Sequence, residues 1–66
     1  MRVTVNGTER EVASGCTLPA LLAELGLRPG SVVVERNGTA LLRSEVDAVV
    51  LAEGDRLELV RAVAGG

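Results

Sequence analysis

Two Asn-Gly dipeptides constrain the fold of this chain more than any other feature of its sequence. Asn6-Gly7 and Asn37-Gly38 each follow a short run of alternating or β-branched residues. Asn-Gly favours a type I′ turn, because that turn needs a positive φ at both central residues, and it joins antiparallel strands. The sequence therefore predicts two β-hairpins. Their strands are expected over residues 2–5, 8–12, 32–36 and 39–42.

Between the hairpins, four leucines share the spacing of one face of a helix, i, i+3, i+4 and i+7. Thr17 is a good N-cap, Pro19 falls in the first turn, and Gly26 can end the helix in a left-handed conformation. The stripe is one-sided, so we expect a short helix that lies across a sheet. Its leucines are Leu18, Leu21, Leu22 and Leu25.

The rest of the chain supplies one more strand. Ser44 to Ala48 is expected to form a single helical turn, with Ser44 as its candidate cap, or an irregular crossover. Val49 to Leu51 is expected to fill the core. The last strand covers residues 56–61, with Leu57 and Leu59 facing inward and Val60 facing outward. A hairpin cannot join the first strand to the last, so a central parallel pair is expected.

This order of elements predicts an α+β protein of the β-grasp type. Its sheet is mixed, with four to five strands, and one main helix crosses one face. The expected organisation is a β-grasp domain over residues 1–61 and a flexible tail over residues 62–66.

Composition excludes several function classes. The 66 residues are 47% apolar without any aromatic side chain, which predicts one small domain with an aliphatic core. Net charge is −2, and the positive residues are dispersed arginines, so no nucleic-acid partner is expected. Apolar runs are too short to cross a bilayer, so a cytoplasmic protein without a membrane partner is expected.

The chain also lacks the residues of a catalytic centre. It has no His and one Cys, so no His-activated nucleophile and no His/Cys metal site is available. We therefore expect a substrate or adaptor of enzymes that needs no cofactor of its own. An enzyme in its own right is disfavoured.

The final residues, Ala62-Val63-Ala64-Gly65-Gly66, are the candidate for chemistry. Gly65 and Gly66 have no Cβ, so their backbone can enter a slot too narrow for other residues. The α-carboxylate of Gly66 is ionised at neutral pH and could attack the α-phosphate of ATP in an activating enzyme. The alternative is an ordinary frayed ending of small residues.

Docking to such an enzyme is expected through the outward face of the last strand. Glu58, Val60 and Val63 are the candidates, with Arg61 and Arg36 as charged contacts. The alternative is that these are ordinary surface residues, since single exposed apolar side chains are common. Cys16, at the start of the helix, is either a sulfur relay or an inert, half-buried thiol.

Taken together, these motifs resemble the ThiS sulfur carriers of thiamine biosynthesis, and the likeness covers nearly the whole chain. Leu42 departs from the family, which often has Pro before the Arg. The segments that carry the resemblance are Val5 to Gly7, Thr17 to Leu27, Val34 to Gly38, Arg43, Glu53 to Val60 and Gly65-Gly66.

The resemblance implies a ubiquitin-like β-grasp fold and a function. A ThiF/MoeB-like adenylyltransferase would adenylate Gly66 with ATP and magnesium. Sulfur from a cysteine desulfurase or a rhodanese-type donor would then give a thiocarboxylate, and the thiazole synthase ThiG would take that sulfur. Gly65 and Ala64 would thread into the partner's channel. Two alternatives stay open, a MoaD-like carrier for molybdopterin synthesis and a plain β-grasp binding module.

Overall fold

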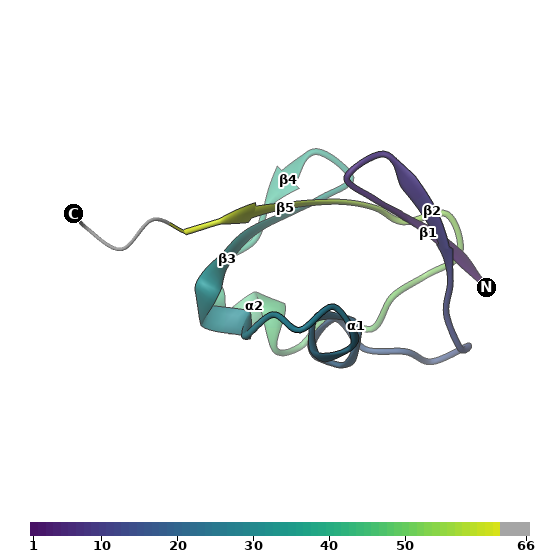
Figure 1. The fold of residues 1–66 in the computed structure, drawn as a ribbon, viewed down its shortest axis with the longest axis horizontal. Coiled ribbons are helices and arrows are strands. Elements are labelled where there is room, and N and C mark those ends of the chain that lie inside the picture. Colours follow the sequence, from purple (N-terminus) through teal and green to yellow (C-terminus); the bar gives the residue numbers. More distant parts are fainter. Residues whose placement is uncertain (63–66) are drawn as a thin grey trace.

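The computed structural model describes residues 1–62, which form one layer of strands covered by helices on one face (Figure 1). The strands are β1 (Arg2–Val5), β2 (Thr8–Glu11), β3 (Val32–Arg36), β4 (Thr39–Ala40) and β5 (Arg56–Arg61). The helices are α1 (Leu18–Glu24), α2 (Arg43–Val46) and the 3₁₀-helix η1 (Pro29–Ser31).

The sheet has the order β2-β1-β5-β3-β4, so the last strand of the chain lies at its centre. Strands β1 and β5 run parallel, with Thr4 opposite Arg56, whereas β5 and β3 run antiparallel. The expected mixed β-grasp sheet with a central parallel pair is confirmed in its five-stranded form.

Both hairpin turns have the predicted backbone. Asn6 and Gly7 have φ values of 48° and 83°, and Asn37 and Gly38 have values of 51° and 85°. Helix α1 also begins as predicted, because the Thr17 hydroxyl accepts a hydrogen bond from the Ala20 N–H at 3.2 Å.

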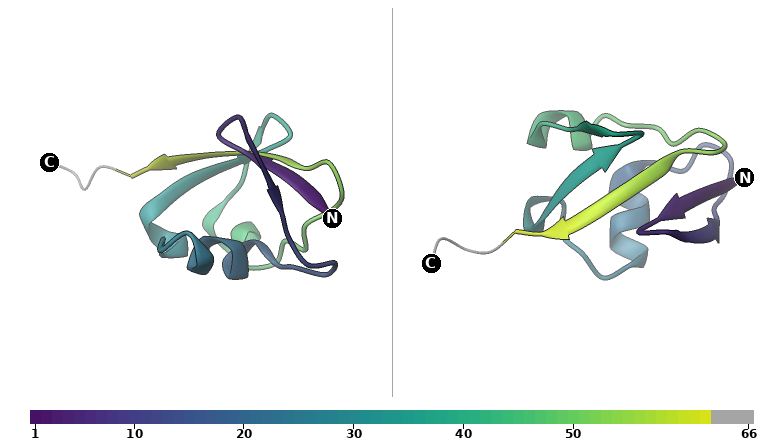
Figure 2. Two further views of the ribbon diagram at one scale, coloured as in Figure 1. Left: turned by 45° about the vertical axis from the view of Figure 1, so that its right-hand side comes forward. Right: turned by 90° about the horizontal axis from the view of Figure 1, so that it is seen from above.

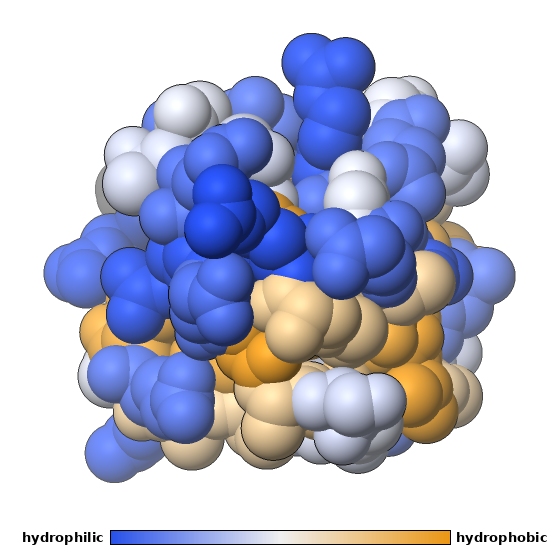
Figure 3. Space-filling model, turned by 90° about the vertical axis from the view of Figure 1, so that its right-hand side faces the viewer, coloured by the Kyte–Doolittle hydropathy of each residue, from blue (hydrophilic) through white to orange (hydrophobic). Residues whose placement is uncertain are grey.

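The core lies between the sheet and α1 and is entirely aliphatic within the described residues. Leu18, Leu21 and Leu22 on α1 are fully buried against the inner face of β1, β3 and β5. Figure 2 shows α1 crossing beneath the sheet, with β5 running diagonally across it. From the end of the molecule shown in Figure 3, polar side chains cover the sheet side and apolar ones appear beneath it.

Three expectations after the second hairpin were wrong. The return strand ends at Ala40 instead of residue 42, because Leu42 already occupies the N-cap position of α2. Ser44 is not the cap, since α2 begins at Arg43 and the Glu45 carboxylate accepts from the Leu42 N–H at 2.6 Å. Val50 is 56% exposed, whereas Leu51 enters the core as expected.

Candidate functional site

The candidate site is the end of β5 and the outer face of the sheet beside it. Strand β5 ends at Arg61, and the Ala62 N–H donates to the Ser31 carbonyl at 2.8 Å. The expected chemistry falls on Gly66, with Gly65 and Ala64 threading and Val63 docking. These residues lie outside the described part of the chain.

A buried carboxylate fixes the beginning of β5. Asp55 is 5% exposed, and its Oδ2 accepts from the Ala52 N–H at 2.8 Å and from Arg36 Nη2 at 2.9 Å. Its Oδ1 accepts from the Asn37 side chain at 3.0 Å. Burial alone would raise the pKa of Asp55, but these hydrogen bonds and the Arg36 charge outweigh it, so the pKa lies below its ordinary value.

Arg36, a predicted docking contact, is therefore also a structural residue. Its guanidinium is partly buried and joins β3 to the turn before β5 through Asp55. A docking role for Arg36 stays a prediction. The other predicted charge contact, Arg61, is exposed at the end of β5.

The two Asn-Gly turns do more than reverse the chain, because both asparagine side chains bind β5. Asn6 Oδ1 accepts from the Leu59 N–H at 2.8 Å, and Asn6 Nδ2 donates to the Leu59 carbonyl at 3.2 Å. Asn37 Oδ1 accepts from the Arg56 N–H at 2.9 Å. Sequence reasoning identified the turns but missed this second role, for which it offers no local signal.

On the outer face, Glu58 and Val60 project to solvent as predicted, and Val60 is 61% exposed. The register places β3 residues directly opposite them, Glu35 beside Glu58 and Val33, 51% exposed, beside Val60. We refer to Val33, Glu35, Glu58 and Val60 as the outer patch. Sequence reasoning placed Val33 outward but did not include it or Glu35 among the docking residues, because the pairing register was not known.

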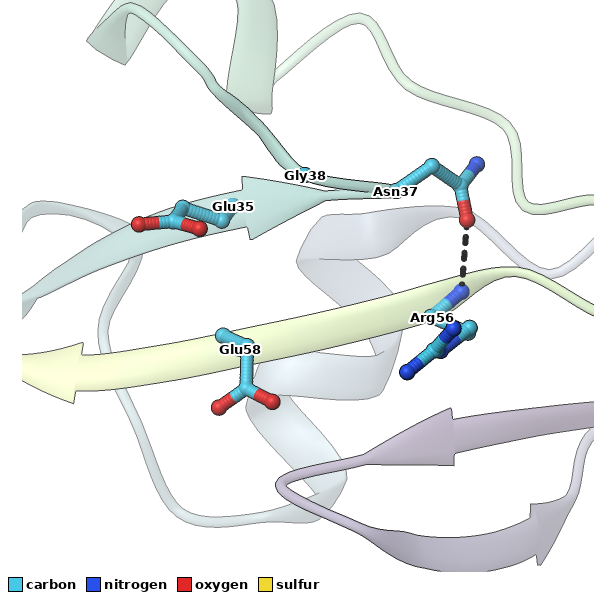
Figure 4. Close-up of a pocket in the computed structure, with 5 residues that line it drawn as sticks. All are labelled: Glu35, Asn37, Gly38, Arg56 and Glu58. Carbon is cyan, nitrogen blue, oxygen red and sulfur yellow. Dashed lines mark hydrogen bonds between the residues drawn. The ribbon is translucent and has the colours of Figure 1, made fainter.

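The acidic half of the outer patch borders a shallow hollow of about 420 Å³. Figure 4 shows Glu35 on β3 and Glu58 on β5, with Arg56 at the beginning of the same strand and Asn37-Gly38 at the turn. Like charges directly opposite on a sheet repel each other. By contrast, Arg2 on β1 pairs with Glu9 and Glu11 of the neighbouring β2.

Cys16 is half-buried, and its thiol donates to the Thr17 carbonyl at 3.4 Å. This contact does not distinguish a sulfur relay from an inert thiol. Within residues 1–62, the structure holds no group of three acidic, His or Cys side chains arranged to bind a metal. Nor does that part of the chain contain a helix of the length and apolarity needed to span a bilayer.

Comparison with known proteins resolves the family. The family model described as the ThiS family matches residues 3–66. This chain belongs to the ThiS family. The match runs through β1, α1, both Asn-Gly turns and β5 and continues over the last residues of the chain.

Two solved structures of one ThiS protein support this assignment. The crystal structure of a thiamine biosynthesis protein (ThiS) from Geobacter metallireducens is 35% identical and covers both chains fully, with a TM-score of 0.82. The NMR structure of the protein from that organism gives a TM-score of 0.78 and covers 88% of the compared chain. The ubiquitin-like β-grasp fold implied by the resemblance is confirmed.

Curated relatives carry a different name. A thiazole synthase from Magnetococcus marinus is 41% identical over all 66 residues, and one from Paramagnetospirillum magneticum is 39% identical. This ThiS-family chain spans only 20% of the length of each of them. The relatives therefore combine a segment like this chain with a much longer additional part.

Proposed function

We propose that this chain is a sulfur carrier protein of thiamine biosynthesis that acts as a co-substrate of other enzymes. The observation that carries the proposal is the ThiS-family match, which extends from β1 over Gly65 and Gly66. The fold supports it, because the central strand β5 ends at Arg61, four positions before Gly65 in the sequence.

The proposed chemistry takes place at the carboxylate of Gly66. A ThiF/MoeB-like adenylyltransferase uses ATP and magnesium; the carboxylate oxygen attacks the α-phosphorus, and pyrophosphate leaves. A sulfur nucleophile then attacks the acyl carbon, and AMP leaves. Sulfide gives the thiocarboxylate directly, whereas a persulfide from a cysteine desulfurase or rhodanese-type donor needs a thiol to reduce the resulting acyl disulfide.

A thiazole synthase of the ThiG type is the proposed acceptor of this sulfur. The curated relatives support it, because proteins named thiazole synthase contain a segment similar to this whole chain. Holding carrier and acceptor together makes sulfur transfer effectively intramolecular, which can lower its barrier by several kcal/mol. The same relatives favour thiazole formation over molybdopterin synthesis.

The outer patch is the proposed docking surface for these enzymes. It combines the apolar pair Val33 and Val60 with the acidic pair Glu35 and Glu58, so a complementary partner presents an apolar centre and a cation. Val60→Asp is expected to weaken binding to the adenylyltransferase, measured by titration calorimetry. Unchanged affinity would remove Val60 from the surface.

The experiment that tests the proposed function is sulfur loading followed by intact-protein mass spectrometry. The protein is incubated with ATP, magnesium, a ThiF-type enzyme and a sulfur source. We expect a mass shift equal to one sulfur-for-oxygen exchange, located at Gly66 by fragmentation. A variant with one residue appended after Gly66 is the control and should fold but stay unmodified. An unchanged mass with an enzyme that loads another ThiS protein would contradict the proposal.

A further inference from the structure

Strand β5 extends beyond the end of its neighbour β1. Within residues 1–62, the last part of β5 therefore has no strand beside it on that edge. The β1–β5 ladder consists of Thr4 opposite Arg56 and Val5 opposite Leu57, after which the chain turns away at Asn6. On the other side, β3 accompanies β5 as far as Arg61. The last part of β5 therefore has a neighbouring strand on one side within residues 1–62.

Backbone hydrogen bonds alternate between the two edges of a central strand. The Ala62 N–H bonds Ser31, and the Arg56 carbonyl accepts from Asn37, so even-numbered residues of β5 face β3. The carbonyls of Asp55 and Leu57 accept from Thr4 and Asn6, so odd-numbered residues face β1. By this alternation, the N–H and C=O of Arg61 point to the side where β1 has ended.

The Asn6 side chain marks the end of the covered edge. Its amide meets both the N–H and the C=O of Leu59, as a residue of a neighbouring strand would. The next pair of groups on this edge belongs to Arg61, and no strand of the described chain lies opposite them. We define the open edge as the backbone N–H and C=O of Arg61, the last residue of β5, on the β1 side.

An apolar groove of about 280 Å³ lies beside the open edge on the helix-covered side of the sheet. It is lined by residues that follow α1, by the end of β1 and the turn after it, by the first residue of β3 and by the last part of β5. Its lining residues are Val5, Asn6, Leu25, Leu27, Val32, Leu59 and Arg61. A strand laid on the open edge would direct every second side chain toward this groove.

We propose that the open edge binds an extended segment of the thiazole synthase, which adds to the sheet as a strand and places an aliphatic side chain in the groove. The N–H and C=O of Arg61, which have no strand opposite them within residues 1–62, favour a peptide over a small molecule, and the groove favours an apolar residue in that peptide. A second copy of this chain fits less well, because antiparallel pairing about Arg61 would bring two guanidinium groups together. This inference rests on the proposed function for the identity of the partner.

Hydrogen exchange read by NMR tests the edge without any substitution. In the free protein, the Arg61 amide should exchange at close to the unprotected rate, whereas the amides of Val60 and Ala62 should be protected by β3. Adding the thiazole synthase of the same organism should slow exchange at Arg61 by about tenfold or more. An Arg61 amide that is protected in the free protein, or unprotected in the complex, would overturn the proposal.

Substitution by proline gives a second test with a matched control. Arg61→Pro removes the N–H that faces the open edge and leaves the bonds to β3, so the fold should persist. We expect it to weaken binding to the synthase by about tenfold, as for the loss of one interface hydrogen bond. Arg61→Ala keeps the N–H and should bind more tightly than Arg61→Pro; equal affinities would contradict strand addition.

The groove is tested by Leu27→Ser, with Leu42→Ser as the same change at an exposed leucine away from the groove. The first variant should lose affinity for the synthase, and the second should not. Formation of a dimer through this edge, seen by analytical ultracentrifugation of the free protein and lost in Arg61→Pro, would assign the edge to a second copy and overturn the proposal. Sulfur loading of Gly66 is measured separately, so the carrier function and the open edge can fail independently.

Discussion

Two side chains, Asp55 and Asn37, tie the second hairpin to the start of the central strand. Asp55 accepts hydrogen bonds from three residues and is buried, whereas the Asn37 amide bonds both Asp55 and the Arg56 N–H. A buried carboxylate with several donors is stable only while it is charged, because protonation removes an acceptor and leaves the Arg36 charge uncompensated.

The first prediction concerns acid stability. The pKa of Asp55 is lowered on folding from its ordinary value of 3.8, so the folded protein favours the charged form. This stabilisation is complete above that value and is lost as the pH falls through the lower folded pKa. Asp55→Asn should therefore be less stable than the wild type at pH 7, by about 2 kcal/mol for a charged hydrogen-bonded group.

Urea denaturation followed by circular dichroism at several pH values measures this effect. The difference between wild type and Asp55→Asn should shrink as the pH falls below 3.8. A difference that stays constant with pH would show that Asp55 acts through packing and not through its charge.

The second prediction concerns Asn6. Asn6→Gly keeps the positive φ of the turn, 48° in the wild type, but removes both bonds to Leu59. Because these bonds are exposed to solvent, the expected loss of unfolding free energy is about 1–2 kcal/mol. The Leu59 amide should also exchange faster. Thr8→Gly, beyond the turn on the edge strand β2, is a control that should leave exchange at Leu59 unchanged.

At the scale of elements, the pair β3 and β5 decides what the outer face presents. Their register sets Glu35 against Glu58 and Val33 against Val60. The first pair disfavours the folded chain by itself, whereas a partner cation would turn it into an attraction. The acidic pair is therefore favourable for binding a cationic partner and unfavourable for the stability of the free chain.

The third prediction follows from this register. Glu35→Lys places a cation opposite Glu58 and should stabilise the fold by about 0.2–1 kcal/mol. The same change should weaken binding to the adenylyltransferase. Glu24→Lys, on the exposed side of α1, alters net charge equally and should change neither quantity as much. Unaltered affinity in Glu35→Lys would exclude the acidic pair from docking.

Elements with strong local signals were predictable from sequence, and those decided by tertiary contacts were not. The Asn-Gly turns and the Thr17 cap depend on one or two residues and were placed correctly. The start of α2 was not, because its cap is the Leu42 backbone bonded to Glu45 and not a Ser side chain. The neighbours of Glu58 and Val60 were not predictable either, since cross-strand register depends on residues more than twenty positions apart.

At the scale of the whole molecule, one aliphatic layer joins both α-helices to the three inner strands. Residues from β1, α1, β3, α2 and β5 meet in a single core cluster. A domain of this size has a small margin of stability, so one core side chain is a large share of it. The ends of β5 and the outer patch therefore keep their geometry only while that layer is intact.

The fourth prediction tests this dependence. Leu21→Ala, at a fully buried position of α1, should reduce the unfolding free energy by about 2–5 kcal/mol, and unfolding should remain a single cooperative transition. Circular dichroism and amide exchange at β5 should report the same loss. Ala23→Ser, on the exposed side of the same helix, is the control. Separate transitions for α1 and β5 would contradict a single core.

The aliphatic core has a practical consequence for the study of complexes. The chain contains no Phe, Tyr or Trp, so it has almost no absorption or fluorescence in the near ultraviolet. Any tryptophan emission from a mixture with an enzyme then belongs to that enzyme alone. Changes in the wavelength or intensity of this emission on titration would report binding of the carrier near a tryptophan of the enzyme, without a label on either protein.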